Sequence, residues 1–75
     1  MEEENTFFRL MEDQKFNEAL SVVRSVLAQL DTEQNKLKKA IWLQYKGMVT
    51  LELRWNKVSL SCFEQAKLLL ESIQP

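Results

Sequence analysis

The chain has 75 residues, of which 45% are hydrophobic and 28% charged, and its formal net charge is −1. That length allows a single domain at most, residues 1–75, and a chain so short buries only about 60% of the surface that its unfolded form exposes. The near-neutral charge gives no overall field to attract nucleic acid or an anionic membrane. One glycine and one proline in the whole chain favour helices over a turn-rich β architecture.

The cysteine content and the amino-terminal residues bear on cellular location. Cys62 is the only cysteine, so it cannot form an internal disulfide and gives no sign of an oxidising compartment. Glu2, Glu3 and Glu4 are acidic, whereas secretory and mitochondrial leaders are basic there. Apolar runs such as Leu68–Leu70 are far shorter than the roughly 20 residues that span a bilayer. We therefore expect a cytoplasmic protein with no membrane partner.

Apolar residues recur at helical spacing in the first part of the chain. Phe7, Leu10 and Met11 are three or four residues apart, or adjacent, which predicts a short helix over about residues 3–12. A polar run follows, and a longer apolar stripe then predicts a second helix to about residue 30. The members of that stripe are Phe16, Ala19, Leu20, Val23, Val26, Leu27 and Leu30. These two helices form the first predicted hairpin, about 3–30.

A second hairpin, about 32–73, is predicted from the same kind of pattern. Asp31 and Gln34 have the spacing of a capping box, so a third helix is expected to begin there and to end near 54–56. Its apolar positions are Leu37, Ile41, Tyr45, Met48 and Trp55, widened by Trp42, Val49 and Leu51. The fourth helix carries Leu60, Phe63, Ala66, Leu70 and Ile73. It begins either at Asn56 or at Ser61, where Ser61 and Glu64 would form another capping box.

The predicted fold class is therefore all-α, with four helices in two antiparallel helical hairpins. Gly47, Ser59, Phe63 and Ala66 are separated by twelve, four and three residues. This small-small-aromatic-small pattern resembles the tetratricopeptide repeat, chiefly over residues 40–70, and implies a tetratricopeptide-like stack of hairpins. A generic four-helix bundle is the alternative.

The first hairpin resembles the same family through Ala19, Val23 and Val26. Aligning Ala19 with Ser59 gives a repeat of 40 residues, and aligning it with Ala66 gives 47, whereas the family repeats every 34. We expect about six additional residues around 31–38. Arrays of such hairpins usually need about three repeats for a stable core. The missing neighbour is therefore expected to be another chain.

The resemblance implies that the first helix of each hairpin lines a concave face that binds a peptide or helix. The residues carried over to that face are Phe8, Met11, Glu12, Gln44, Met48, Leu51 and Glu52, with Glu4 beside them. Methionine side chains adapt to ligands of different shape, and acidic edges suit an amphipathic, partly basic helix. The alternative is that Phe8, Met11, Met48 and Leu51 are ordinary core between the hairpins.

Catalysis is not predicted. The chain has no histidine, Cys62 has no base near it in the sequence, and no acidic cluster has the spacing of a metal-binding loop, so we expect neither cofactor nor metal. Cys62 is expected to be a small buried hydrophobe. Lysines 36, 38, 39 and 46 beside Trp42 and Tyr45 invite a nucleic-acid hypothesis, but these aromatic residues fit the apolar stripe and the lysines are expected to face water.

The sequence thus predicts a non-catalytic protein-protein interaction module, acting as an adaptor, a small chaperone or a subunit of a complex. Its partner would be an apolar or amphipathic helix or peptide of another protein, or a second copy of the chain, and not nucleic acid. Two alternatives stay open. One is a self-associating helical structural protein, and the other is an immunity-type or antitoxin-type inhibitor.

Overall fold

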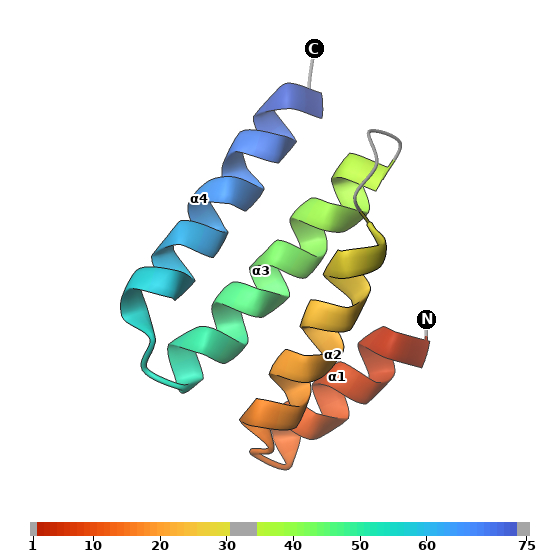
Figure 1. Ribbon diagram of the computed structural model, residues 1–75, viewed down its shortest axis with the longest axis vertical. Helices are drawn as coiled ribbons and strands as arrows, with labels where there is room; N and C mark the ends of the chain where they lie inside the picture. The colour runs from red at the N-terminus through yellow and green to blue at the C-terminus, as the bar shows by residue number, and fades with distance from the viewer. Residues whose placement is uncertain (1, 31–34, 74–75) are drawn as a thin grey trace.

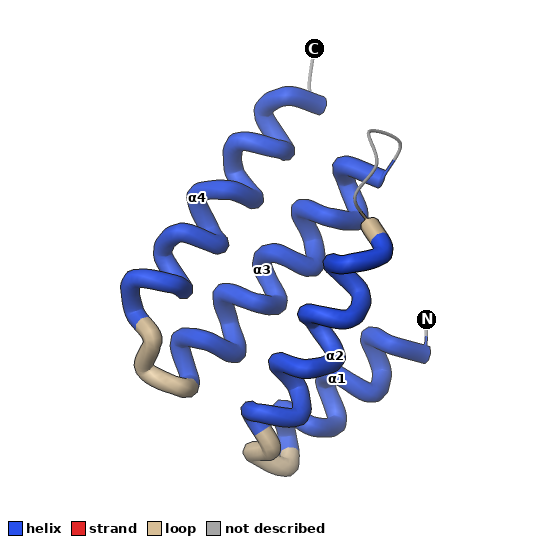
Figure 2. The backbone as a smooth tube through the Cα atoms, viewed as in Figure 1, coloured by secondary structure: helices blue, strands red, loops and turns tan. Residues whose placement is uncertain are grey.

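The computed structural model describes residues 2–30 and 35–73, and within them the chain forms four α-helices and no strand (Figure 1). They are α1 (Glu2–Glu12), α2 (Phe16–Gln29), α3 (Lys36–Glu52) and α4 (Asn56–Ile73). Consecutive helices run in opposite directions, and short turns join α1 to α2 and α3 to α4 (Figure 2). The predicted all-α fold is confirmed. The predicted capping box of Asp31 and Gln34 lies outside the described residues.

The four helices have an open arrangement. Helix α3 packs against both α2 and α4, α1 packs against α2 and also contacts α3 through its aromatic rings, and α1 and α4 lie apart (Figure 1). The Cα atoms extend over 38 × 27 × 17 Å, so the molecule is thin in one direction. A closed four-helix bundle would bring the first and last helices together, and this arrangement does not.

Both hairpins turn on a residue with left-handed backbone. Gln14 has φ 60° and Arg54, forty residues later, has φ 65°. After each, the next amide donates to a carbonyl five residues earlier at 2.8 Å, which is the closure of a Schellman motif. The helix ends next to the turns, Glu12 with Glu52 and Phe16 with Asn56, have the same offset of forty residues. The two turns therefore share one local geometry, at the offset of the alignment of Ala19 with Ser59.

The ends of α3 and α4 differ from the sequence prediction. Helix α3 ends at Glu52 instead of near 54–56, because Arg54 leaves the right-handed region. Trp55 therefore lies in the turn and not in the stripe of α3. Helix α4 begins at Asn56, directly after this turn, so the first of the two predicted starts is confirmed. The alternative start with a capping box is wrong, because Ser61 and Glu64 lie inside the helix and are exposed.

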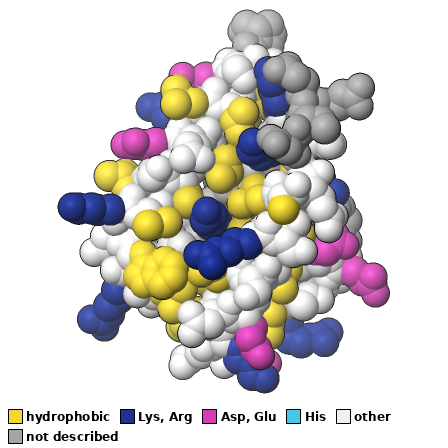
Figure 3. Space-filling model, viewed as in Figure 1, with side chains coloured by type: hydrophobic (Ala, Val, Ile, Leu, Met, Phe, Trp, Pro, Cys, Tyr) yellow, Lys and Arg dark blue, Asp and Glu magenta, His cyan; other side chains and the backbone are white. Residues whose placement is uncertain are grey.

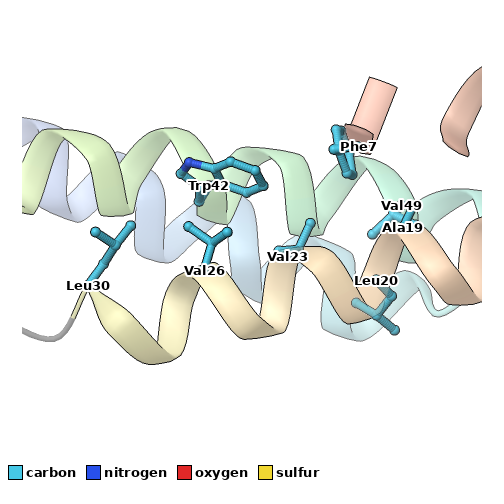
Figure 4. Packing of buried hydrophobic residues seen from close by; sticks show 8 residues of the cluster. All are labelled: Phe7, Ala19, Leu20, Val23, Val26, Leu30, Trp42 and Val49. Carbon is cyan, nitrogen blue, oxygen red and sulfur yellow. The ribbon is translucent and has the colours of Figure 1, made fainter. Parts of the chain in front are cut away.

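The main core lies between α1, α2 and α3. Trp42 and Phe7 are its largest fully buried side chains, and Trp42 projects from α3 toward Val26 of α2 (Figure 4). The buried members of this core are Phe7, Ala19, Leu20, Val23, Val26, Leu30, Trp42 and Val49. A smaller cluster of Ala40, Leu43 and Ala66 lies between α3 and α4. The predicted stripe of α2 is confirmed at its buried positions.

The buried faces of α3 and α4 agree with the predicted ones only in part, since Trp42, Val49 and Ala66 are buried as predicted. On α3 a second buried side was not predicted, with Ala40, Leu43, Gly47 and Thr50, while Leu37, Met48 and Leu51 are exposed. On α4 the buried residues are Ser59, Cys62 and Ala66, and Leu60, Phe63 and Ile73 are exposed. Close packing at Gly47 and Ser59 admits small side chains, so a stripe drawn through the largest hydrophobic residues misses part of the buried surface between α3 and α4.

Gly47 sets the distance between α3 and α4. A Cβ atom at this position would lie 2.7–2.9 Å from three ring carbons of Phe63, closer than packed carbon atoms approach. The Gly47 carbonyl accepts a hydrogen bond from Ser59 Oγ at 2.8 Å, so the same residue also binds α4 through its backbone. Residues 47, 59 and 63 of the repeat-like pattern thus contact one another.

We expect Gly47→Ala to destabilise the protein by up to about 2 kcal/mol, since overpacking costs about 1–3 kcal/mol and alanine regains about 1 kcal/mol of helix propensity. In a Phe63→Ala background the clash is gone, so the same substitution should stabilise by about 1 kcal/mol. Urea denaturation of the four proteins measures this double-mutant cycle. Equal effects in both backgrounds would contradict the close contact.

Candidate protein-binding surface

An aromatic cluster joins α1 to α3. The Phe7 ring stacks on Tyr45 with centroids 5.0 Å apart and meets the edge of Trp42 at 6.1 Å. Trp42 and Tyr45 are themselves edge to face at 5.0 Å. Phe8 lies on the outer side of this cluster, with its ring 5.2 Å from Tyr45. Offset and edge-to-face pairs are the favourable aromatic geometries, so these contacts stabilise the packing of α1 against α3.

Tyr45 also carries a polar link between the two helices. Its hydroxyl donates to Glu4 Oε2 at 2.7 Å, across 41 residues of sequence. Burial raises the pKa of Tyr45 to about 12, and the hydrogen bond to the Glu4 carboxylate and its negative charge add to the increase. All three effects favour the neutral phenol over the phenolate. This link holds the acidic edge of α1 against α3.

The predicted binding residues lie on α1 and α3, and we call this set the α1/α3 surface. It comprises Phe8, Met11, Glu12, Gln44, Met48, Leu51 and Glu52. Phe8, Met48 and Leu51 are 40%, 38% and 53% exposed, while Met11 is half-buried against the main core. The alternative that all four apolar members are ordinary core is therefore wrong for these three. Glu12, Gln44 and Glu52 are exposed.

Helix geometry places the members from α3 on one face. Gln44, Met48 and Leu51 are spaced by four and three residues, and Leu37, seven residues before Gln44, extends the same face. Leu37 is exposed, although the sequence pattern assigned it to the core. Phe8 from α1 is linked to this helix through Tyr45. The structure thus connects the two parts of the α1/α3 surface through an aromatic contact, and Leu37 is an exposed member that the sequence prediction missed.

Charges frame the α1/α3 surface unevenly. Glu12 and Glu52 stand at the carboxyl-terminal ends of α1 and α3, which both lie at the lower side of Figure 1. On the face shown in Figure 3, apolar side chains run between α4 and α2, with Lys and Arg side chains over their middle. Lysines 36, 38, 39 and 46 are half-buried. Long lysine stems cover apolar surface while the charge reaches water.

Cys62 is buried, as predicted for a small hydrophobe. Burial raises the pKa of its thiol, and the nearby positive charge of Lys46 opposes that increase. Within residues 2–30 and 35–73, no three Cys, Asp or Glu side chains lie close enough to hold a metal ion. None of the helices in those ranges is long and apolar enough to cross a membrane.

Comparison with protein-family models, with curated proteins and with solved structures finds no match to this chain. Its two hairpins can nevertheless be compared with each other at their offset of forty residues. Leu20 is 3% exposed and its counterpart Leu60 is 60% exposed, while Val23 is fully buried and Phe63 is 37% exposed. Helix α3 covers α2, and no described helix covers the corresponding side of α4.

Tyr45 is the only tyrosine, so a tyrosinate absorbance titration reports on it alone. We expect a midpoint near 12 in the folded protein, against about 10 after unfolding in urea. Because the folded-state pKa is the higher one, this contribution to stability is present below about pH 10 and is lost as the pH rises toward 12.

Glu4→Gln should lower the Tyr45 midpoint only partly, because burial is the larger cause of the raised pKa. Glu3→Gln, which changes an exposed neighbour, is the matched control and should leave the midpoint unchanged. A folded-state midpoint near 10 in the unaltered protein would contradict the buried, hydrogen-bonded placement of the Tyr45 hydroxyl.

Proposed function

We propose that the protein is a non-catalytic interaction module that binds an amphipathic helix of another protein on the α1/α3 surface. One observation carries the proposal: Phe8, Met48 and Leu51 are exposed large apolar side chains, and Phe8 lies against Tyr45 of the same helix that carries the other two. Large apolar side chains grouped on one face mark interaction sites. The resemblance of the hairpins to tetratricopeptide repeats supports the same face as the binding face.

The chemistry of the α1/α3 surface favours one kind of partner. Met11 and Met48 are unbranched and can repack around different apolar side chains. Glu12 and Glu52 give the surface acidic edges. A helix with an apolar face and basic flanks satisfies both properties, because apolar contact supplies affinity and charge complementarity supplies orientation.

We infer a role as an adaptor, a small chaperone or a subunit of a larger complex. Each of these roles uses a binding face and no chemical step. A cytoplasmic location belongs to the same proposal, because the single reduced Cys62 suits a reducing compartment.

A synthetic amphipathic helix with leucines on one face and lysines along both edges is the probe for this proposal. Titration into isotope-labelled protein, followed by NMR, should shift the amide signals of Phe8, Met11, Met48 and Leu51 more than those of α4. Replacing Glu12 and Glu52 together by Lys should weaken the affinity about tenfold, because two favourable charge pairs become repulsive.

Glu2→Lys with Glu18→Lys is the matched control, since it makes the same change in net charge at two other exposed glutamates. This control should keep the affinity of the unaltered protein, apart from a small uniform loss that added salt removes. An equal loss in both double variants, or signal shifts spread over all four helices, would defeat the proposed surface.

A further inference from the structure

The outer face of α4 has its own pattern, distinct from the α1/α3 surface. Leu60 and Leu68 are the two most exposed large hydrophobic residues among those described. Four exposed charges flank them in the order Lys57, Glu64, Lys67 and Glu71. Helical spacing places all six on one face, which we call the α4 face. Acidic, basic and apolar side chains alternate along the edge that α4 forms in Figure 3.

The charges along the α4 face alternate in sign, so that two copies of α4 running in opposite directions place opposite charges across from each other. An antiparallel copy with its twofold axis near residues 64–65 places Lys57 opposite Glu71 of the other copy, and Glu64 opposite Lys67. The same axis places Leu60 opposite Leu68. Each pair is in register to within about 3 Å along the helix, from the rise of 1.5 Å per residue, and Glu64 lies near both Lys67 and Glu64 of the other copy. A parallel copy would instead align like charges.

Shape agrees with this pairing. A shallow hollow on the α4 face is lined by Glu64, Lys67, Leu68 and Glu71. In the antiparallel arrangement, Leu60 of the second copy approaches the hollow beside Leu68. Leu60 also occupies the position whose counterpart in the first hairpin, Leu20, is covered by a neighbouring helix. A leucine at this position of a hairpin can therefore pack against a neighbouring helix.

We propose that two copies of the chain associate through antiparallel pairing of their α4 faces. The pairing is isologous, so each contact occurs twice across the axis. A single pair of helices buries less than the roughly 1,200–2,000 Å² of a standard interface, so the dimer should dissociate on dilution. It leaves the α1/α3 surface free in both copies, and this inference does not depend on the proposed function.

Sedimentation equilibrium of the full chain under reducing conditions tests the dimer. The apparent mass should rise from one chain to two with increasing concentration. Glu64→Lys with Glu71→Lys makes the α4 face wholly basic, and Lys57→Glu with Lys67→Glu makes it wholly acidic. Each variant alone should self-associate at least about tenfold more weakly than the unaltered chain. An equal mixture of the two should associate again, because every pair is then of opposite sign.

Recovery in the mixture separates loss of the interface from loss of folding, and circular dichroism checks that each variant is helical. Met48→Glu, on the α1/α3 surface, is the control and should self-associate like the unaltered chain. Three outcomes would overturn the proposal: a monomer at every soluble concentration, charge variants that dimerise normally, or a dimer lost in the Met48→Glu control. Peptide binding to the α1/α3 surface can succeed or fail independently of each of these.

Discussion

The structure depends on α3, which packs against α1 and α2 on one side and against α4 on the other, in two different ways. Toward α1 and α2 it presents Trp42, Tyr45 and Val49, whose bulk fills the main core. Toward α4 it presents Gly47, over which the Phe63 ring and the Ser59 hydroxyl lie. Aromatic packing on one side and close backbone approach on the other hold two hairpins together in a chain that could not support two separate cores.

This division of α3 explains why large apolar residues remain on the outside. Close packing against α4 requires small residues, so Leu37, Met48 and Leu51 occupy the remaining side of α3 and face solvent. The same requirement on α4 buries Ser59, Cys62 and Ala66 and leaves Leu60 and Leu68 outside. Exposure of these residues is a consequence of how the hairpins pack. Two separate apolar surfaces result, one acidic at its edges and one with charges that complement each other.

The sequence predicted the helices and their pairing well, because α1 and α2 have clear apolar periodicity and because apolar residues also recur at helical spacing in α3 and α4. It could not predict the turns in detail, since the left-handed positions are occupied by Gln14 and Arg54 instead of glycine. It also could not predict which side of α3 or α4 is buried, since this depends on the helix spacing that Gly47 allows. For the proposed binding surface, Met48 and Phe8 were predicted from the family resemblance, whereas Leu37 was assigned to the core.

Because α3 packs against both α2 and α4, we expect the two hairpins to unfold as one cooperative unit. Trp55→Phe leaves Trp42, between α2 and α3, as the only tryptophan. Urea unfolding of this variant, followed by Trp42 fluorescence and by helical circular dichroism, should give coincident transitions, as expected for a two-state domain. Loss of the Trp42 signal at lower urea than loss of helix would show that the hairpins unfold separately and would contradict the account.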